Sequence, residues 1–491
     1  MKGGLPKLDY LLKILPMLKK AGANALLLEY EDAFPYTGRL ANLSSAADSM
    51  TSEDVSMFVN AAVLGGFEVI PLVQTFGHLE YVLKLPEFSH LREADEDPAD
   101  ICPSHPEAFK LITEMLQQVM ALHEESKYVH IGCDEVFHLA ECPVCKSSSR
   151  GHDLYLDHVK AVAQFVTERF DANVLIWDDV LRKIPLKLLR TSQIGNFVEP
   201  VIWVYGTRFT DVFPTDLWTT YAKAFSDIWT AGAFKGAFGA AEFAPNVYKH
   251  LVNALTWQSV LTGVEPFFSR LRGQIFTGWS RYDHFANLCE LLPNSLPSAL
   301  LTLLVTSRGS TYEEVTSALH EILGCPGLVA LPANIRALES DPRLWDSRKC
   351  VFVGADVVQV MWDYQGLMLQ TQGLVRAAAA SAWVSDYNDK HNWTSRRRVL
   401  DELKFLPPVQ SKVSQLGAET RRVLSQYLTP SAVEEWMQQK IVPLAKSLFD
   451  LETRGRRLAS ITTWGRRTRD QVAAQLHFIA GQKKDSEMNM N

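Results

Sequence analysis

The chain has 491 residues, of which 47% are hydrophobic and 21% charged, so it can bury a large core and is not disordered as a whole. At roughly 150 residues per domain, this length corresponds to about three domain-equivalents, or to one large barrel with a smaller part. The net charge is −7, which argues against a dedicated nucleic-acid-binding protein, because such a protein needs a basic field.

The N-terminal segment, residues 1–22, has no uninterrupted apolar core ahead of a small-residue cleavage site. Lys13, Lys19 and Lys20 give its apolar part the spacing of an amphipathic helix. We therefore expect neither a signal peptide nor a membrane span, and we predict a cytoplasmic location, with the nucleus left open. Seven scattered cysteines are typical of a reduced, intracellular chain and not of a disulfide framework.

The first 285 residues alternate between short apolar runs and longer helical segments. Helices are predicted at residues 8–21, 52–64, 107–123, 154–170 and 247–261. Strands are predicted at residues 25–28, 68–73, 128–132, 174–177, 200–204, 227–230 and 274–278. Near-continuous apolar strands separated by helices are typical of a parallel sheet covered on both faces. The pattern predicts an α/β fold, a (β/α)8 TIM-type barrel.

The predicted strands number seven, whereas a closed barrel of this type needs eight. The chain opens with Gly3, Gly4 and Pro6 and then enters a helix directly, at the place where the first strand-to-helix loop should lie. We therefore expect the first strand to be missing from this sequence. A strand overlooked elsewhere in the chain is the alternative.

After about residue 290 the pattern becomes helical, with few strand signals. Helices are predicted at residues 298–304, 312–322, 356–379, 409–428 and 432–447. This pattern divides the chain into a catalytic barrel at residues 1–295, a mostly helical C-terminal region at 296–482 and a disordered tail at 483–491.

Two adjacent acidic residues, Asp134 and Glu135, end the apolar strand that begins at Tyr128. In a barrel, the carboxyl ends of the strands carry the catalytic groups. Adjacent carboxylates repel each other, so we expect one of them to be held protonated and the other ionised. Cleavage of a glycosidic bond needs that combination. An acidic cap on the following helix is the structural alternative.

Aromatic residues follow several of the other predicted strands. Four tryptophans lie at or near strand ends, which indicates an aromatic-walled site suited to the apolar faces of a sugar ring. These are Trp177, Trp203, Trp229 and Trp279. Tyr205, Tyr282 and Asp283 follow on the same rim, where they can bond ring hydroxyls.

The ordered set of motifs resembles glycoside hydrolase family 20, and within it the hexosaminidase D branch. The matching segments are residues 27–36, 71–78, 130–136, 177–179 and 277–284. The resemblance covers roughly residues 1–300, in the order that the family shows. The Asp-Glu pair after a His-x-Gly strand is fairly specific by itself, and the ordered set is much more so.

The resemblance implies retaining hydrolysis in which the 2-acetamido oxygen of the substrate attacks the anomeric carbon and forms an oxazolinium ion. Glu135 would be the general acid and then the base, and Asp134 would hold the acetamido nitrogen. Tyr205 or Tyr282 would bond the acetamido oxygen, and His78 would lie behind Glu135. The implied sugar contacts are Trp279 below the ring, Trp177 and Trp203 around the acetamido methyl group, and Glu29, Glu31 and Asp32 at the outer hydroxyls.

One position departs from the family pattern. Many members have an aspartate four residues before the matching histidine, whereas this chain has Gln74. An uncharged partner would weaken a proton relay through His78.

A CxxC pair, Cys142 and Cys145, lies near His138 and His152. A single pair without a second one at standard spacing is more often a loop than a zinc site. We therefore predict no metal and no organic cofactor.

The predicted function is hydrolysis of terminal N-acetylhexosamine from glycoconjugates, with N-acetylgalactosamine preferred over N-acetylglucosamine, as a step of carbohydrate metabolism. The expected partner is such a glycan, without nucleic acid or a membrane span, and a homodimer stays open. One alternative is a non-catalytic carbohydrate-binding or scaffold protein on an incomplete barrel. Another is a barrel glycosidase that uses two carboxylates on sugars without an acetamido group.

Overall fold

A computed structural model describes residues 1–148, 151–213, 216–309, 311–327 and 329–466 of the chain. The described residues form two compact units. The first comprises Met1–Gly366 and Ser414–Pro443, and the second comprises Leu367–Val413 and the described residues from Leu444 onward. The predicted boundary between residues 295 and 296 therefore falls inside the first unit, and the predicted tail at 483–491 lies outside the described residues.

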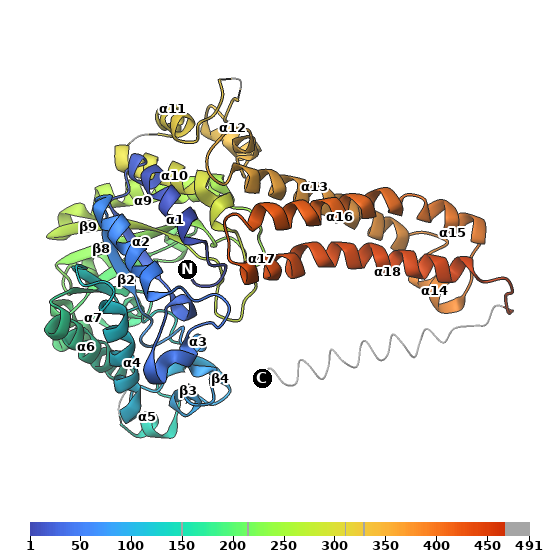
Figure 1. Ribbon diagram of the computed structural model, residues 1–491. Coiled ribbons are helices and arrows are strands. Elements are labelled where there is room, and N and C mark those ends of the chain that lie inside the picture. Colours follow the sequence, from blue (N-terminus) through green and yellow to red (C-terminus); the bar gives the residue numbers. More distant parts are fainter. Residues whose placement is uncertain (149–150, 214–215, 310, 328, 467–491) are drawn as a thin grey trace. The chain divides into compact units, whose positions relative to one another are not determined.

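Seven parallel strands form the centre of the first unit (Figure 1). They pair in the order β1-β2-β5-β6-β7-β8-β9. The strands are β1 (Ala25–Glu29), β2 (Glu68–Leu72), β5 (Tyr128–His130), β6 (Asn173–Trp177), β7 (Glu199–Trp203), β8 (Asp227–Lys235) and β9 (Arg270–Gly278). Within the described ranges no strand joins β1 to β9, so the seven strands make a nearly closed barrel. The predicted barrel class and its seven strands are confirmed.

Helices between the strands cover the outside of the barrel. They are α1 (Leu8–Lys20), α2 (Ser52–Leu64), α3 (Glu80–Leu83), α4 (Pro106–Met120), α5 (Pro143–Ser148), α6 (Gly151–Phe170), α7 (Leu186–Ser192), α8 (Leu217–Tyr221) and α9 (Val247–Val264). In α1 the buried residues Tyr10, Leu11, Ile14 and Leu15 recur at helical spacing on one face. A capping box between Thr51 and Asp54 fixes the start of α2.

One hairpin was not predicted from the sequence. It lies between β2 and β5 and consists of the antiparallel strands β3 (Arg92–Ala94) and β4 (Asp97–Ile101). Its residues are largely polar and include Pro98, so they lack the apolar alternation that indicates a strand. The hairpin packs against the chain that follows β5, where Asp100 accepts hydrogen bonds from the backbone of Phe137 and His138.

Helix α10 (Leu292–Arg308) explains why the barrel does not end near residue 295. It contacts α9, β8 and α1, and most of its residues are buried. The helices α11 (Tyr312–Ile322) and α12 (Ile335–Ser340) follow in the same unit. The segment Tyr427–Thr429 also belongs here, because Lys7 N donates to Tyr427 O at 2.8 Å.

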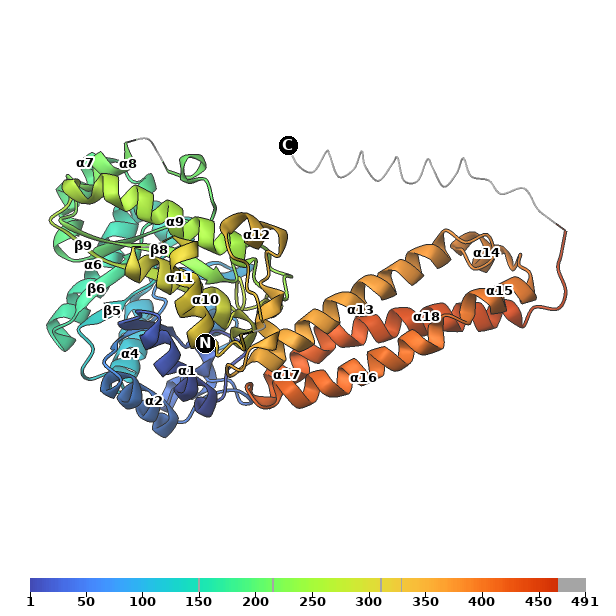
Figure 2. The same cartoon turned by 90° about the horizontal axis from the view of Figure 1, so that it is seen from above.

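The second unit is helical, as predicted for this part of the chain. Of the remaining helices, α14 (Asp386–His391) and α15 (Arg396–Leu403) lie wholly in this unit, whereas α17 (Pro430–Trp436) lies wholly in the first. Helices α13 (Ala355–Ala379), α16 (Leu406–Leu424) and α18 (Val442–Ala459) have residues in both units. Figures 1 and 2 show α13, α16 and α18 side by side. Arginines of α18 pair with acidic residues, as a solvated helix face does, and Arg457 lies 2.6 Å from Asp389.

A disulfide corrects the expectation that all the cysteines are reduced. Cys325 and Cys350, which are 25 residues apart, are bonded to each other. The other five cysteines are free. The pairing depends on the fold bringing the end of α11 to the segment before α13, which spacing in the sequence does not reveal.

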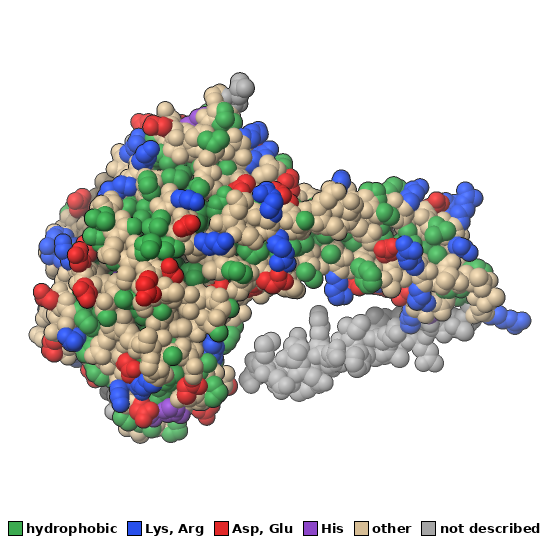
Figure 3. Space-filling view, viewed as in Figure 1, with side chains coloured by type: hydrophobic (Ala, Val, Ile, Leu, Met, Phe, Trp, Pro, Cys, Tyr) green, Lys and Arg blue, Asp and Glu red, His purple; other side chains and the backbone are tan. Residues whose placement is uncertain are grey.

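Charges are mixed on the surface of the protein. Figure 3 shows acidic and basic side chains interspersed over the visible face. Within the described part of the chain, each helix is too short or too polar to cross a lipid bilayer.

Candidate active site

The turn after β5 sets Asp134 and Glu135 in different surroundings. Gly132, Cys133 and Glu135 have positive φ angles of 68°, 64° and 47°. A Cβ atom on Gly132 would collide with the Gln74 side chain, so this position requires glycine. The turn buries Asp134, whose side chain is 12% exposed, whereas the side chain of Glu135 is 41% exposed. The two neighbouring carboxyl groups are therefore not equivalent.

His78 contacts both members of this pair. Its Nε2 atom lies 3.1 Å from Glu135 Oε2 and 3.5 Å from Asp134 Oδ2. Its Nδ1 atom lies 3.7 Å from Glu80 Oε1. Burial lowers the pKa of His78, but the three carboxyl groups outweigh that effect and hold the pKa well above its usual value. At neutral pH His78 is therefore an imidazolium beside the Glu135 carboxylate.

The pKa values of the two acids move in opposite directions. Burial raises the pKa of Asp134 to about 7, against the attraction of His78 and with repulsion from Asp179. The hydrogen bond with His78 lowers the pKa of Glu135. The sequence predicted such a split between adjacent carboxyl groups. In the free protein, however, Asp134 retains its proton to higher pH than Glu135 does, which is the reverse of the roles implied by the family resemblance.

Asp179, two residues beyond β6, fixes the backbone of Glu135. Its Oδ2 atom accepts a hydrogen bond from Glu135 N at 3.0 Å, and its Oδ1 atom accepts one from Trp203 Nε1 at 3.4 Å. Asp178 is fully buried and accepts a bond from Arg182 Nε at 3.0 Å. Asp179 therefore positions Glu135. The sequence motif contains it, but sequence analysis gave it no role.

Trp203, Tyr205 and Trp279 come together after β7 and β9. Trp279 Nε1 donates to the Tyr205 hydroxyl at 3.0 Å, and the rings of Trp203 and Tyr205 have centroids 5.0 Å apart. Trp177 lies 6.2 Å from Trp279 between ring centroids, but only 1% of it is exposed. The predicted aromatic group is therefore assembled, with Trp177 buried behind it.

Trp229 does not belong to this group, which corrects its predicted place. Strand β8 extends to Lys235, so Trp229 is near its beginning and not at its carboxyl end. Its Nε1 atom donates to Glu199 Oε2 at 2.6 Å, at the start of β7, and its ring packs on Tyr128 with centroids 5.4 Å apart. Trp229 therefore fills the barrel interior far from the strand ends that carry the acids.

Tyr282 and Asp283 lie in the loop after β9 and have local partners. The Tyr282 hydroxyl accepts a hydrogen bond from Gly239 N at 2.8 Å. Asp283 Oδ1 accepts bonds from the backbone nitrogens of Phe285 and Ala286, each at 2.8 Å. Both side chains thus stabilise loops. Tyr205 is the tyrosine that the structure brings to Trp279.

Glu29 and Glu31 form an acidic group at the end of β1. Gln74 Nε2 donates to Glu29 Oε1 at 3.3 Å, so Gln74 is not the relay partner of His78. The carboxyl group beside His78 Nδ1 belongs instead to Glu80. Glu31 is balanced by Lys2, whose Nζ atom lies 3.2 Å from Oε1. Glu31, Asp32 and His284 are close enough together to hold a cation, but Lys2 already supplies a positive charge there.

Lys235, at the end of β8, is a residue that sequence analysis missed. It is 1% exposed, and its Nζ atom donates to Trp279 O at 2.6 Å and to Glu290 O at 3.0 Å. Burial lowers the pKa of this lysine. It holds the backbone of Trp279 in place. A longer predicted strand would have placed this lysine at the carboxyl edge of the barrel.

Comparison with known proteins gives the family. Residues 10–198 match the glycosyl hydrolase family 20 catalytic domain. The chain is 34% identical to human (Homo sapiens) Hexosaminidase D over 91% of each chain. It is 40% identical to Hexosaminidase D from Bos taurus over 67% of this chain and 96% of that protein. The chain therefore belongs to glycosyl hydrolase family 20 and is a glycosidase. The predicted assignment, a hexosaminidase D-like β-N-acetylhexosaminidase, is confirmed.

Among solved structures, the crystal structure of a β-N-acetylhexosaminidase from Bacteroides fragilis resembles this chain with a TM-score of 0.48. The two are 15% identical in sequence, and the match covers 69% of this chain and 72% of the other. Dispersin B matches with a TM-score of 0.42 at 13% identity, over 61% of this chain and 94% of the other. The family assignment rests on the sequence relatives.

Proposed function

We propose that this glycosidase removes terminal non-reducing N-acetylhexosamine from glycoconjugates, with retention of configuration and with the acetamido group of the substrate as nucleophile. One observation carries the proposal: of the two adjacent carboxyl groups, Glu135 is open to solvent and Asp134 is buried, and both contact the same nitrogen of His78. Two carboxylates that act as acid and nucleophile would instead stand apart on either side of the scissile bond.

In the first step the acetamido oxygen attacks the anomeric carbon while the glycosidic bond breaks. Glu135 gives its proton to the departing oxygen, and the positive charge is left on the oxazolinium ring. Asp134 accepts a hydrogen bond from the acetamido N–H and balances that charge. In the second step Glu135 takes a proton from water, the water oxygen bonds to the anomeric carbon, and the oxazolinium ring opens.

His78 reconciles this scheme with the low pKa of Glu135. The proton that the acid needs lies on His78 Nε2, 3.1 Å from Glu135 Oε2. A sugar bound over Glu135 excludes water, and a low-dielectric site disfavours a separated pair of charges. The proton then moves to Glu135 and leaves two neutral groups. In this scheme His78 stores the proton and Glu135 delivers it.

Tyr205 is the donor to the acetamido oxygen in this scheme. Its hydroxyl accepts a hydrogen bond from Trp279 Nε1. Beyond the effect of burial, Asp134 and Glu135 are near enough to raise the pKa of Tyr205, whereas Glu290 and Glu242 raise that of Tyr282. Trp279 and Trp203 supply the aromatic surface for the sugar ring.

The preference for N-acetylgalactosamine over N-acetylglucosamine is part of the proposal and is supported by the resemblance to the hexosaminidase D branch. The preference is tested by comparing kcat/KM for aryl β-glycosides of the two sugars. The matching β-galactoside without an acetamido group serves as a third substrate. We expect no turnover of it, and equal rates on the third substrate would rule out participation of the acetamido group.

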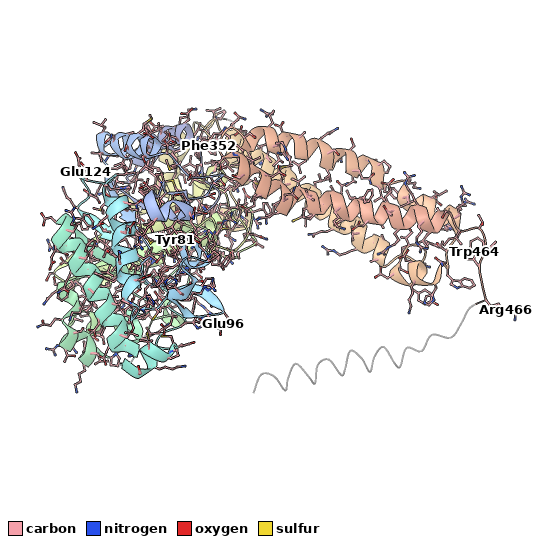
Figure 4. All side chains as sticks on the ribbon, turned by 60° about the horizontal axis from the view of Figure 1, so that its bottom comes forward. Tyr81, Glu96, Glu124, Phe352, Trp464 and Arg466 are labelled. Atoms are coloured by element: carbon pink, nitrogen blue, oxygen red, sulfur yellow. A yellow bond between two sulfur atoms is a disulfide. The ribbon has the colours of Figure 1, made fainter. Side chains whose placement is uncertain are left out.

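The acid–base role is tested with Glu135→Gln, which keeps the shape of the side chain and removes its proton chemistry. We expect kcat to fall by roughly 10²–10⁴-fold. Glu124→Gln is the matched control, because Glu124 is an exposed residue in the loop before β5 (Figure 4). An unchanged rate in Glu135→Gln would reject the assignment. Binding of the sugars without turnover by the wild-type chain would instead support the scaffold alternative.

A further inference from the structure

Three cysteines and a glutamate from separate segments meet at one place outside the active site. Glu93 lies in β3 and Cys102 follows β4, whereas Cys142 directly precedes α5 and Cys145 lies in its first turn. One ligand atom from each of the four lies within 4.8 Å of the others. Figure 1 shows the β3–β4 hairpin and α5 at the same end of the barrel unit.

The spacing of these atoms fits a tetrahedral ion. Cys102 Sγ lies 3.6 Å from Cys142 Sγ and 3.5 Å from Cys145 Sγ, and Cys145 Sγ lies 3.2 Å from Glu93 Oε2. Zinc–sulfur bonds of about 2.3 Å at tetrahedral angles separate two sulfurs by about 3.8 Å. These three pairs therefore lie within a few tenths of an ångström of the spacing that Zn²⁺ requires, and the four ligand atoms all lie within 4.8 Å of one another.

Glu93 is held so that one oxygen faces the sulfurs. Its Oε1 atom accepts hydrogen bonds from Glu141 N at 2.7 Å and from Cys142 N at 2.9 Å. Oε2 is left to point at Cys145, and the residue is only 3% exposed. A buried carboxylate with one fixed and one inward oxygen is arranged as a ligand is, since supporting bonds orient the groups that bind a metal.

Two of the three cysteines are buried, Cys142 is partly buried, and hydrogen bonds support the group. Cys102 is 6% exposed and Cys145 is fully buried. Cys145 N donates to Cys142 Sγ at 3.3 Å, and Ser104 Oγ lies 3.1 Å from Cys145 Sγ. A backbone N–H donor to a sulfur stabilises the thiolate, which is the form that binds metal.

We propose that Cys102, Cys142, Cys145 and Glu93 bind one structural Zn²⁺ ion, with three thiolates and one carboxylate. Zinc accepts mixed sulfur and oxygen ligands and prefers the closed, four-coordinate arrangement that these residues offer. From the sequence we noted His138 and His152 near the CxxC pair but predicted no metal, so this proposal departs from that prediction. His138 instead bonds Asp97 and Glu141 at 3.0 Å each, and Cys102 and Glu93, which are distant in sequence, supply the other ligands.

The ion would tie the β3–β4 hairpin to the chain that carries the active-site acids. Asp100 of the hairpin already accepts bonds from the backbone nitrogens of Phe137 and His138, at 3.1 and 2.9 Å. These residues directly follow Glu135. A zinc ion bound by Cys142 and Cys145 would hold the other end of the loop that begins at Phe137. Its role is therefore to hold the loop and not to take part in the reaction.

Metal content of the full chain tests the proposal directly. The protein is produced with zinc in the medium and purified without chelators. Its metal content is then measured by inductively coupled plasma mass spectrometry. We expect about one zinc per chain. We expect Glu93→Gln and Cys145→Ala to lose most of it. Two matched controls should keep it: Glu96→Gln, an exposed glutamate on the same hairpin (Figure 4), and Cys289→Ala, a buried free cysteine elsewhere.

A second measurement uses only the wild-type chain, so it does not depend on whether the variants fold. Cobalt replaces zinc, and the spectrum should show thiolate-to-metal charge transfer and the visible bands of a tetrahedral ion. As a mercurial reagent modifies the thiols, the amount of zinc released should rise in proportion to the number of thiols that have reacted. Folded protein without zinc, a cobalt spectrum without thiolate bands, or a disulfide between Cys102 and either partner in mass spectrometry would each overturn the proposal.

Discussion

Residues 134 and 135 show how one turn gives two neighbouring acids opposite properties. Both carry the same functional group and lie beside the same imidazole. Asp134 is buried, so desolvation dominates and raises its pKa to about 7; Glu135 is partly open, so the hydrogen bond from His78 dominates and lowers its pKa. The positive φ angle at Glu135 produces this difference, because it turns one side chain inward and the next outward.

Burial of Asp134 predicts a stability that depends on pH. The pKa rises from 3.8 to about 7 on folding, so the contribution of this group is fully present below pH 4 and is lost as the pH rises through 7. Asp134→Asn does not titrate and escapes that loss. We compare the free energy of unfolding of the variant with that of the wild type by urea denaturation at pH 5 and at pH 8. The difference should shift in favour of the variant by about 1–3 kcal/mol between the two pH values.

The control for this measurement is Asp95→Asn, a change at an exposed aspartate. It should alter stability equally at both pH values. A gain in Asp134→Asn that is the same at pH 5 and pH 8 would contradict the raised pKa.

Tyr205 and Tyr282 differ in what their hydroxyl groups contact, and this predicts different effects of the same change. Tyr205→Phe removes the partner of Trp279 and the proposed donor to the acetamido oxygen, so we expect kcat/KM to fall by about 10²-fold. Tyr282→Phe removes one loop contact and should cost far less. Steady-state kinetics on an aryl N-acetylhexosaminide compares them, and equal losses would speak against the choice of Tyr205.

Among the elements, the strands were predictable and the contacts between loops were not. Apolar runs located all seven barrel strands, because strands buried on both faces need apolar side chains throughout. The end of β8 was missed, since Ala231–Ala233 are too small to extend an aliphatic pattern, and Trp229 was misplaced as a result. The pairing of Gln74 with Glu29 and the meeting of Cys102 with Cys142 depend on distant loops, about which local patterns say nothing.

Strand β8 gives a prediction for Trp229. Trp229→Phe loses the bond to Glu199 and leaves space in the barrel interior. We expect the free energy of unfolding to fall by about 1–3 kcal/mol, with KM unchanged. Trp279→Phe is the comparison, because it alters the proposed sugar platform and should raise KM. Urea denaturation measures the stability of both variants, and steady-state kinetics measures their KM. A raised KM in Trp229→Phe would show that Trp229 does contribute to sugar binding.

For the molecule as a whole, the order of barrel and helices was predictable from the sequence, whereas the division into units was not. The chain re-enters the first unit at Ser414–Pro443, and such a return leaves no mark on local composition. The disulfide was missed for the same reason. The cytoplasmic or nuclear location and the homodimer stay predictions.

The disulfide between Cys325 and Cys350 closes a loop whose ends are 25 residues apart. By loop-closure entropy, the cross-link contributes about 3 kcal/mol to the first unit. Cys325→Ala with Cys350→Ala should therefore lower the thermal midpoint of unfolding. A mild reductant should lower the midpoint of the wild type and leave that of the double variant unchanged. A wild-type midpoint that does not respond to the reductant would show that the bond is not formed in solution.

The carboxylates at the strand ends also bear on which sugars the enzyme accepts. Five carboxyl groups converge there and outnumber the basic groups that contact them, which are Lys2, His78 and His284; the five are Glu29, Glu31, Asp134, Glu135 and Asp179. Burial raises the pKa of Glu29, Asp134 and Asp179, so the negative field grows as the pH rises. Such a field favours the cationic ring that forms in the reaction and repels anions. A terminal residue that carries a sulfate or a carboxylate would meet this repulsion. We therefore expect neutral N-acetylhexosamines to be better substrates than N-acetylhexosamines that carry a sulfate or a carboxylate.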